Sequence, residues 1–383
     1  MENNTKETKL YILLQIILIS LVIMVFLYMY ILIKDANDDK YASYNNQESQ
    51  VVRENTTSGN LQNNNETKNT EEVIPLVKDN PSNGTSYTTN GLNNKYFYNQ
   101  LNDNAKLIYD EIEKNIENLK SGQYTIDLPS SVSDILKQEG GDEALNINFQ
   151  SAWDAIGLDR VDLFFMDVSK VNMIVTKTTF VKSTSYKLAM KPRDSSGYLL
   201  DDIFNGSTVD SMVKEIENKR DEIVKTLVGS DYDKVLKAHD WLVDNVEYDT
   251  TLSDSYIYNL YGALVSRKAV CEGYAEAFKY LMDYVGVPCI LVVGSATNSN
   301  GDTENHEWNY VKINEKWYAV DCTWDDPIIT GNGKITNNIK YKYFLKGADT
   351  INKNHYPNGK ITNQGKEFVY PTLSETSYIN GVY

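Results

Sequence analysis

Three residues in the last third of the chain, Cys271, His306 and Asp321, have the types and the order that covalent catalysis by a thiol needs. The residues after Cys271 are apolar at helical spacing as far as Gly286, which predicts a helix that begins at the cysteine. A thiol there lies at the positive end of the helix dipole, which favours the nucleophilic thiolate. The trio therefore predicts that Cys271 attacks a substrate, His306 transfers the proton and Asp321 fixes the imidazole.

The residues around His306 and Asp321 predict a β-hairpin. Two strand-like runs flank Asn314-Glu315, and a two-residue turn at this point pairs Ile313 with Lys316. In this register His306 and Asp321 are diagonal neighbours on one face of the sheet, because residues two apart on a strand share a face. The hairpin is therefore expected to present both side chains to the thiol.

The sequence blocks around these residues resemble the transglutaminase-like superfamily, a branch of the papain-like thiol enzymes, and are similar to its surface-anchored bacterial members. The blocks lie within residues 232–327 and read Ala-Val-Cys-Glu-Gly-Tyr-Ala, His-Glu-Trp-Asn-Tyr-Val and Trp-Tyr-Ala-Val-Asp-Cys-Thr-Trp-Asp-Asp-Pro. The resemblance implies an α+β fold in which a helix bearing the cysteine packs on an antiparallel sheet bearing the histidine and the aspartate.

The same resemblance implies acyl transfer on protein or peptide amides: hydrolysis, deamidation or cross-linking. Animal transglutaminases of this superfamily carry calcium sites around the core, and this sequence has no credible calcium motif. By this analogy we expect a protease or amidase in preference to a cross-linking transglutaminase. The alternative is a non-catalytic module that binds peptides or cell-wall polymer in the same cleft. A labelled primary amine incorporated into protein would overturn the preference for hydrolysis.

Further residues near the three blocks are candidates for substrate contacts. We expect the oxyanion hole to combine the backbone N–H of Cys271 with a donor from the preceding segment, Tyr261. The residues expected to line the cleft are Trp308, Trp324, Tyr274 and Glu272. Acidic residues close to the trio in sequence suggest an acidic rim that attracts substrates rich in Lys or Arg: Glu272, Glu276, Glu304, Glu307, Asp325 and Asp326.

The other two histidines have structural explanations. His239 lies on the apolar stripe of a predicted helix and is expected in the core. His355, beside Tyr356-Pro357, is expected in a surface loop. Paired Cys-x-x-Cys motifs are absent, and the loop at 298–304 lacks the first ligand of a calcium site, so no metal or cofactor is expected.

Composition limits the function further. The 383 residues are 41% hydrophobic, enough for a large core, and the formal charge of −16 without a basic run argues against nucleic acid as a partner. The three cysteines do not form a disulfide framework. Cys289 and Cys322 are expected on strands that the His306 strand separates, so we expect free thiols.

The order of segments predicts a protein anchored in the cell membrane by a single span, with its catalytic domain extracellular. Residues 1–9 would be a short cytoplasmic tail and 10–33 an apolar signal anchor, long enough to cross a bilayer; a cleaved signal peptide is the alternative. Residues 34–94, rich in Asn, Thr and Ser, would be a disordered tether. Residues 95–228 would form a helical and β-meander region, and 229–383 the transglutaminase-like core with C-terminal strands.

Within these regions the apolar spacing predicts individual elements. Helices are expected over 95–119, 208–228 with Thr208 as its cap, and 232–246. An antiparallel meander is expected over 161–191, and the C-terminal strands over 341–345 and 366–370.

Overall fold

The computed structural model of the protein describes residues 52–54, 68–75, 95–180, 183–201, 203, 206–252, 254–326 and 336–379. Residues 51–383 form one compact unit. The tail and the membrane span predicted at 1–9 and 10–33 lie outside the described residues. None of the described helices is long and apolar enough to cross a membrane.

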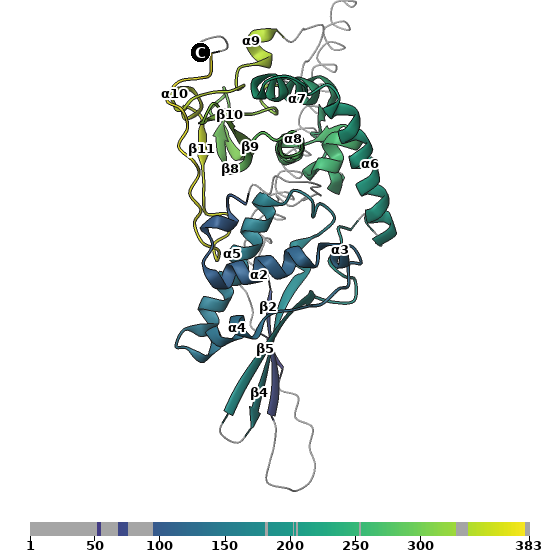
Figure 1. The fold of residues 1–383 in the computed structure, drawn as a ribbon, viewed down its shortest axis with the longest axis vertical. Helices are drawn as coiled ribbons and strands as arrows, with labels where there is room; N and C mark the ends of the chain where they lie inside the picture. Colours follow the sequence, from purple (N-terminus) through teal and green to yellow (C-terminus); the bar gives the residue numbers. More distant parts are fainter. Residues whose placement is uncertain are drawn as a thin grey trace, which may run out of the picture. The chain divides into compact units, whose positions relative to one another are not determined.

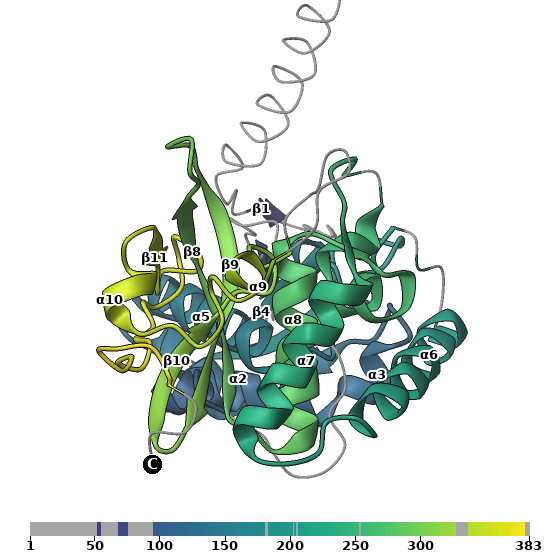
Figure 2. The same ribbon diagram turned by 90° about the horizontal axis from the view of Figure 1, so that it is seen from above.

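The element that carries Cys271 is helix α8 (Cys271–Val285) (Figure 1). Extended Val270 precedes the helix, and Gly286 ends it with a left-handed φ of 86°, so the predicted start and end are confirmed. Helix α7 (Asp231–Asn245) packs against α8 on one side, and strands β8 and β9 pack against it on another (Figure 2). Most side chains of α8 are consequently buried, including charged ones.

The sheet beside α8 is antiparallel and has the strand order β10-β9-β8-β11. The predicted turn is confirmed, because Asn314 and Glu315 both have positive φ, 48° and 63°, and Ile313 pairs with Lys316. The hydrogen-bonded ladder ends one residue before Asp321, which therefore follows its strand directly and does not lie within it. The four strands are β8 (Cys289–Thr297), β9 (Thr303–Ile313), β10 (Lys316–Val320) and β11 (His355–Pro357).

The C-terminal part differs from the predicted pair of strands. Residues 341–345 lie between two short helices, α9 (Asn337–Lys340) and α10 (Ala348–Ile351), and 366–370 make one isolated bridge. Strand β11 instead forms at His355–Pro357, where a surface loop was expected. A strand of three residues is too short to show the alternation on which sequence prediction depends.

A second sheet lies in the N-terminal part of the unit and has the strand order β1-β2-β4-β5-β3. Strand β2 pairs with β4 along its whole length, so the predicted tether is corrected over 52–54 and 68–75. Backbone hydrogen bonds to a strand edge do not require an apolar composition, which explains the error. The strands are β1 (Val52–Glu54), β2 (Lys68–Pro75), β3 (Ile126–Asp127), β4 (Val171–Phe180) and β5 (Ser183–Pro192).

The helices of this part depart from the predictions in ways that burial explains. Helix α5 was missed because nearly all of its sides are buried, which leaves no polar face to give a helical period. The helix expected at 95–119 is broken at Asn115, and the helix expected from Thr208 begins earlier, so Thr208 does not cap it. The helices are α2 (Asp103–Lys114), α3 (Ile116–Leu119), α4 (Ser130–Ser133), α5 (Gly141–Asp159) and α6 (Gly206–Val224).

The boundary predicted between 95–228 and 229–383 does not separate two units. The C-terminal segment returns to α5, where the Thr362 hydroxyl donates to Asp154 at 2.8 Å. The backbone N–H of Lys366 likewise donates to the Ser151 hydroxyl at 2.8 Å. Because both bonds join residues more than 200 positions apart, the two regions share one packed core.

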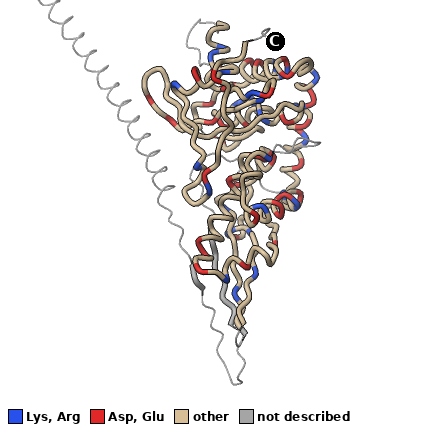
Figure 3. The backbone as a smooth tube through the Cα atoms, turned by 60° about the vertical axis from the view of Figure 1, so that its left-hand side comes forward, with Lys and Arg blue, Asp and Glu red and all other residues tan. Residues whose placement is uncertain are grey.

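Charged residues are interspersed along the described chain (Figure 3), and some of them are buried. Lys279 of α8 is 1% exposed and forms an ion pair with Asp283 one turn later. Asp159, at the end of α5, is close enough for Lys279 to influence its pKa, and it accepts the backbone N–H groups of Phe97 and Tyr98. Charged side chains of α8 and α5 are therefore electrostatically coupled inside the core.

Candidate active site

The thiol of Cys271 is held at the first position of α8 by contacts of the preceding chain. The N–H of Val270 donates to the Ile257 carbonyl at 2.9 Å. Gly273 lets the first helical turn approach this segment closely, because a Cβ there would lie 2.8 Å from the Ile257 oxygen and 2.9 Å from that of Asn259. All three cysteines are free thiols, as predicted; Cys271 is partly exposed and the other two are buried.

His306 lies on β9 beside α8 and is 4% exposed. Its Nε2 is 2.8 Å from Oδ2 of Asp321, so the predicted proximity of these two residues is confirmed. Burial alone would lower the pKa of His306, but Asp321 and then the Cys271 thiol raise it to about 10. Cys271, His306 and Asp321 are therefore neighbours, in an arrangement that favours an imidazolium and a carboxylate beside the thiol.

Asp321 is buried and fully engaged in hydrogen bonds. Burial opposes its ionisation, but His306 and His355 together hold the pKa of its carboxyl well below its usual range. Its Oδ1 also accepts the backbone N–H of Trp324, in the turn that follows β10, at 3.1 Å. The carboxylate is thus held from both of its oxygens.

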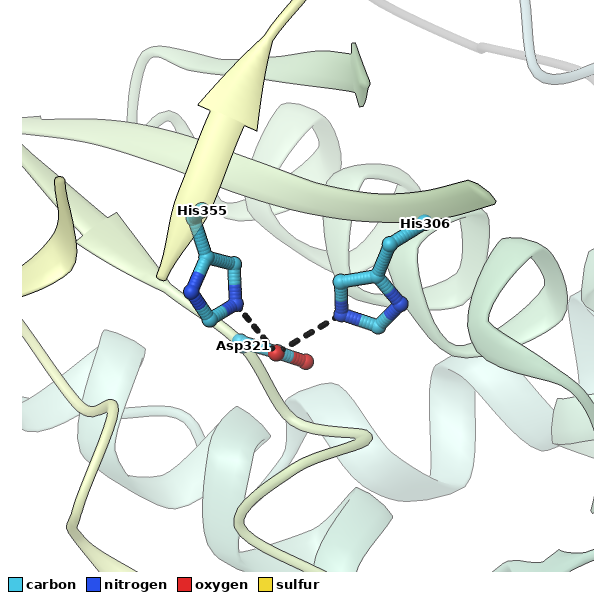
Figure 4. Close-up of side chains that lie close together, drawn as sticks. All are labelled: His306, Asp321 and His355. Carbon is cyan, nitrogen blue, oxygen red and sulfur yellow. Dashed lines mark hydrogen bonds and ion pairs between the residues drawn. The ribbon is translucent and has the colours of Figure 1, made fainter. Parts of the chain in front are cut away.

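The structure corrects the prediction for His355, which is 1% exposed and lies on strand β11. Its Nε2 is 3.0 Å from the same Asp321 oxygen that receives His306 (Figure 4). Sequence reasoning missed this residue because 34 positions separate it from Asp321 and its strand shows no pattern. The three side chains offer ligand atoms within 4.8 Å of one another. Both imidazoles direct Nε2 at one carboxylate oxygen, which is the geometry of a hydrogen-bond network when each Nε2 carries its proton.

The tyrosine predicted to complete the oxyanion hole is directed elsewhere. The Tyr261 hydroxyl donates to Glu215 of α6 at 2.6 Å, and its ring stacks on Phe164. Tyr248 is the tyrosine beside the thiol: burial raises its pKa, and Cys271 is the largest charge that raises it further. A short parallel pair of strands, β6 (Glu247–Tyr248) and β7 (Lys268–Ala269), places Tyr248 opposite Ala269.

Of the four side chains predicted to line a cleft, only Trp324 is partly exposed next to the imidazole, with its ring centroid 5.2 Å from that of His306. Trp308 is 1% exposed and stacks behind His306, where it supports the ring. Tyr274 is fully buried and donates its hydroxyl to Asp326 at 2.6 Å. Glu272 is also buried, so it does not face the solvent.

The acidic rim is not formed as predicted. Four of its six members are buried, only Glu304 is exposed and Asp326 is partly exposed. Charges that follow the apolar pattern of a helix or strand enter the core with it when polar partners are available there. The sequence argument for substrates rich in Lys or Arg therefore loses its basis. The buried members are Glu272, Glu276, Glu307 and Asp325.

His239 is fully buried in the core, as predicted. Its Nε2 is 3.1 Å from Oδ2 of Asp325, and Oδ1 of Asp325 accepts the backbone N–H of Tyr343 at 2.7 Å. Asp325 belongs to the turn that begins at Asp321, so this second histidine–carboxylate pair holds the turn that carries the first.

Residues 221–322, which include Cys271, His306 and Asp321, match the transglutaminase-like superfamily. This part of the chain is a transglutaminase-like domain. The chain is also 25% identical to mouse (Mus musculus) kyphoscoliosis peptidase over 182 residues, which are 44% of this chain and 27% of the mouse protein. Human (Homo sapiens) kyphoscoliosis peptidase is 26% identical over 177 residues, 43% of this chain and 26% of the human protein. The chain thus spans about a quarter of the length of these curated relatives.

Similarity to solved structures is low overall. A crystal structure of a TGase is 18% identical, with a TM-score of 0.28, and the match covers 44% of this chain and 48% of that one. The periplasmic domain of TgpA from Pseudomonas aeruginosa is 11% identical, with a TM-score of 0.23, and the match covers 40% of this chain and 69% of that one.

Proposed function

We propose that the protein is a thiol enzyme that hydrolyses amide bonds in proteins or peptides through an acyl-enzyme on Cys271. The observation that carries the proposal is the 2.8 Å hydrogen bond between His306 and the buried Asp321, next to a partly exposed thiol at a helix start. Members of this superfamily are typically cysteine peptidases or transglutaminases, and the proposal extends that chemistry to this chain.

In the first half of the reaction the Cys271 thiolate attacks the substrate carbonyl carbon and forms a tetrahedral intermediate. The N–H of Cys271 belongs to the first turn of α8, whose N–H groups have no partner within the helix, and it points to where the oxyanion forms. The Tyr248 hydroxyl is the second donor. The His306 imidazolium then protonates the leaving amine, the C–N bond breaks and a thioester remains.

In the second half neutral His306 removes a proton from water, which attacks the thioester carbonyl. The intermediate collapses, the C–S bond breaks and the product leaves as a carboxylic acid, while the proton returns the site to its thiolate–imidazolium form. Asp321 stays ionised in both halves and stabilises the imidazolium whenever it forms. A lysine amine in place of water would give an isopeptide cross-link by the same steps.

The choice of water as the acceptor of the acyl group rests on the relatives that the chain resembles. The relatives from mouse and human are named peptidases, and this supports hydrolysis over cross-linking. As part of the same proposal, the apolar segment 10–33 tethers the enzyme to the cell membrane with its catalytic domain outside. Protease added to intact spheroplasts should then release a soluble fragment that begins between residues 34 and 94; protection of that segment contradicts the tether.

The activity is tested by incubating the protein with a peptide library in water enriched in ¹⁸O, with a labelled primary amine present. Hydrolysis places ¹⁸O in new carboxyl groups, whereas cross-linking places the amine on glutamine, and mass spectrometry separates the two. Both signals should vanish in Cys271→Ala and persist in Cys289→Ala, the matched variant of a buried cysteine. Incorporation of the amine alone would refute hydrolysis, and no product of either kind would refute the enzyme itself.

A further inference from the structure

Asp321 receives two imidazoles, although the proposed reaction needs only one. His306 and His355 both direct Nε2 at Oδ2 of Asp321, at 2.8 and 3.0 Å. From this geometry we infer that His355 is a positioning residue: its N–H holds the Asp321 carboxylate in place against His306, and thereby maintains the thiolate of Cys271. The inference rests on the proposed function, but it concerns a residue that does not touch the substrate.

The first support is the fixed position of the His355 ring. Strand β11 pairs His355 with Ala296 of β8. Three aromatic rings pack around the imidazole, with centroids at 4.7 Å (Trp324), 5.1 Å (Trp308) and 5.1 Å (Tyr343). A ring enclosed in this way loses little entropy when it donates a hydrogen bond, so the bond to Asp321 is stronger than an exposed one would be.

The second support is the group on the far side of the same ring. The Asn354 Oδ1 lies 2.9 Å from Nδ1 of His355, and the Asn354 Nδ2 donates to the Tyr343 hydroxyl at 2.8 Å. A hydroxyl both donates and accepts, so it suits either orientation of the amide. Burial lowers the pKa of His355, and the neutral ring carries one proton. The Asp321 carboxylate can only accept, which requires that proton on Nε2; the Asn354 amide then turns its NH₂ group to Nδ1 and its oxygen to the Tyr343 hydroxyl.

The third support is that His355 adds a second hydrogen bond to Oδ2 of Asp321, which already contacts His306. A carboxylate oxygen with two N–H donors remains ionised at lower pH than one with a single donor, because each bond favours the charged form. Other titratable groups also act on this cluster, from the elements packed against it. They are Cys271, Tyr248, Cys322, Asp325, Lys342, Tyr343 and Glu307, and Glu375 lines the pocket beside His355.

The test compares His355→Met, which removes the donor at similar size, with His355→Gln, whose amide restores an N–H near the position of Nε2. The rate of alkylation of Cys271 by iodoacetamide is measured from pH 5 to pH 9. We expect the acidic limb of this profile to move up by about one pH unit in His355→Met, which is about tenfold slower alkylation at pH 6, and to return most of the way in His355→Gln.

The matched control is Tyr198→Phe, which removes a buried hydroxyl that accepts the backbone N–H of Tyr124 at 3.1 Å, far in sequence from the turn of Asp321. A purely structural effect lowers thermal stability in this variant as in the His355 variants, but only the His355 variants should shift the pH profile. An unshifted limb in folded His355→Met overturns the inference. If wild-type Cys271 is no faster than the buried cysteines at pH 6, the proposed function itself fails, and the two failures are thus distinct.

Should His355→Met not fold, nitrogen NMR of the wild-type protein decides the matter. The chain has only 3 histidines, so their imidazole signals can be assigned by substitution. The inference requires the Nε2–H form of His355 at neutral pH. The Nδ1–H form would leave no proton for Asp321 and would overturn it.

Discussion

The substitution Asp321→Asn removes the negative charge that faces His306 while it keeps the shape of the side chain. The pKa of His306 stands at about 10, against 6.5 for a free histidine, and Asp321 is the largest influence that raises it. At about 1.4 kcal/mol for each pKa unit, the combined effect on the imidazolium is about 5 kcal/mol. Cys271 provides part of it, so we assign about 3 kcal/mol to Asp321, or about two pH units.

An imidazolium weakened by this amount no longer stabilises the Cys271 thiolate at low pH. We therefore expect alkylation of Cys271 in Asp321→Asn to slow by about 10- to 100-fold at pH 6 and to approach the wild-type rate at pH 9, where the thiol ionises without help. The assay is the pseudo-first-order loss of free Cys271 with iodoacetamide, followed by mass spectrometry of the peptide that contains it. Cys289 and Cys322 are buried and provide internal references.

The matched control is Asp154→Asn, because Asp154 is a buried carboxylate that accepts the Thr362 hydroxyl and lies outside the turn of Asp321. It should lower thermal stability without a selective loss of alkylation at pH 6. Equal profiles for wild type and folded Asp321→Asn would refute the electrostatic reasoning. Equal slowing in both variants would mean that a general loosening of the fold is responsible.

Three further predictions concern other buried groups. Tyr248→Phe should lower kcat on any identified substrate by about 10- to 1,000-fold with little change in KM, as expected for an oxyanion donor, whereas Tyr261→Phe should not. Lys279→Met should cost about 3–5 kcal/mol of unfolding free energy in urea titrations, because it leaves Asp283 buried without its cation, and adding Asp283→Leu should recover most of that loss. Burial raises the pKa of Glu307 to about 8, above its unfolded value, so the wild type should lose stability as the pH rises from about 4.5 to 8. Glu307→Gln should remove at least about 1 kcal/mol of that loss at pH 8. If the melting temperature of Glu307→Gln depends on pH as that of the wild type does, this reasoning is wrong.

Features encoded in short continuous sequence could be predicted. The helix that begins at Cys271 has one clear period and a terminal glycine, and the hairpin has a turn of two residues, so the proximity of His306 and Asp321 followed from local rules. Helix α5 and strand β11 could not be found in this way. The first is buried nearly all round and the second is three residues long, so neither has a pattern with one polar side.

The direction of individual side chains was the second feature that the sequence could not predict. Tyr261 and Tyr248 both precede Cys271, and the prediction chose Tyr261 because its segment resembles the one that leads to the cysteine in the superfamily. Its hydroxyl instead faces Glu215, which comes from another helix. The prediction of an acidic rim was wrong for a related reason. The positions of the acidic residues near Cys271, His306 and Asp321 in sequence gave no information about their burial, which depends on elements far away in sequence.

The three histidines of the chain bond to one turn, although they come from three separate elements. His306 and His355 contact Asp321, and His239 contacts Asp325, whose N–H donates back to the Asp321 carbonyl at 3.2 Å. A turn that follows the last hydrogen-bonded pair of a sheet has few other contacts to hold it. A carboxylate that orients an imidazole must keep its position to within about 0.5 Å, so it needs such support.

This arrangement extends the functional unit beyond the part of the chain that defines its family. The superfamily match ends at residue 322, before the Tyr343 N–H that binds Asp325 and before His355 itself. A fragment that stops there would contain Cys271, His306 and Asp321 but would lose two of the groups that hold the turn. The triad residues alone are therefore insufficient to fix their own geometry. The segment from 343 to 355 belongs to the site as much as the helix that carries the thiol does.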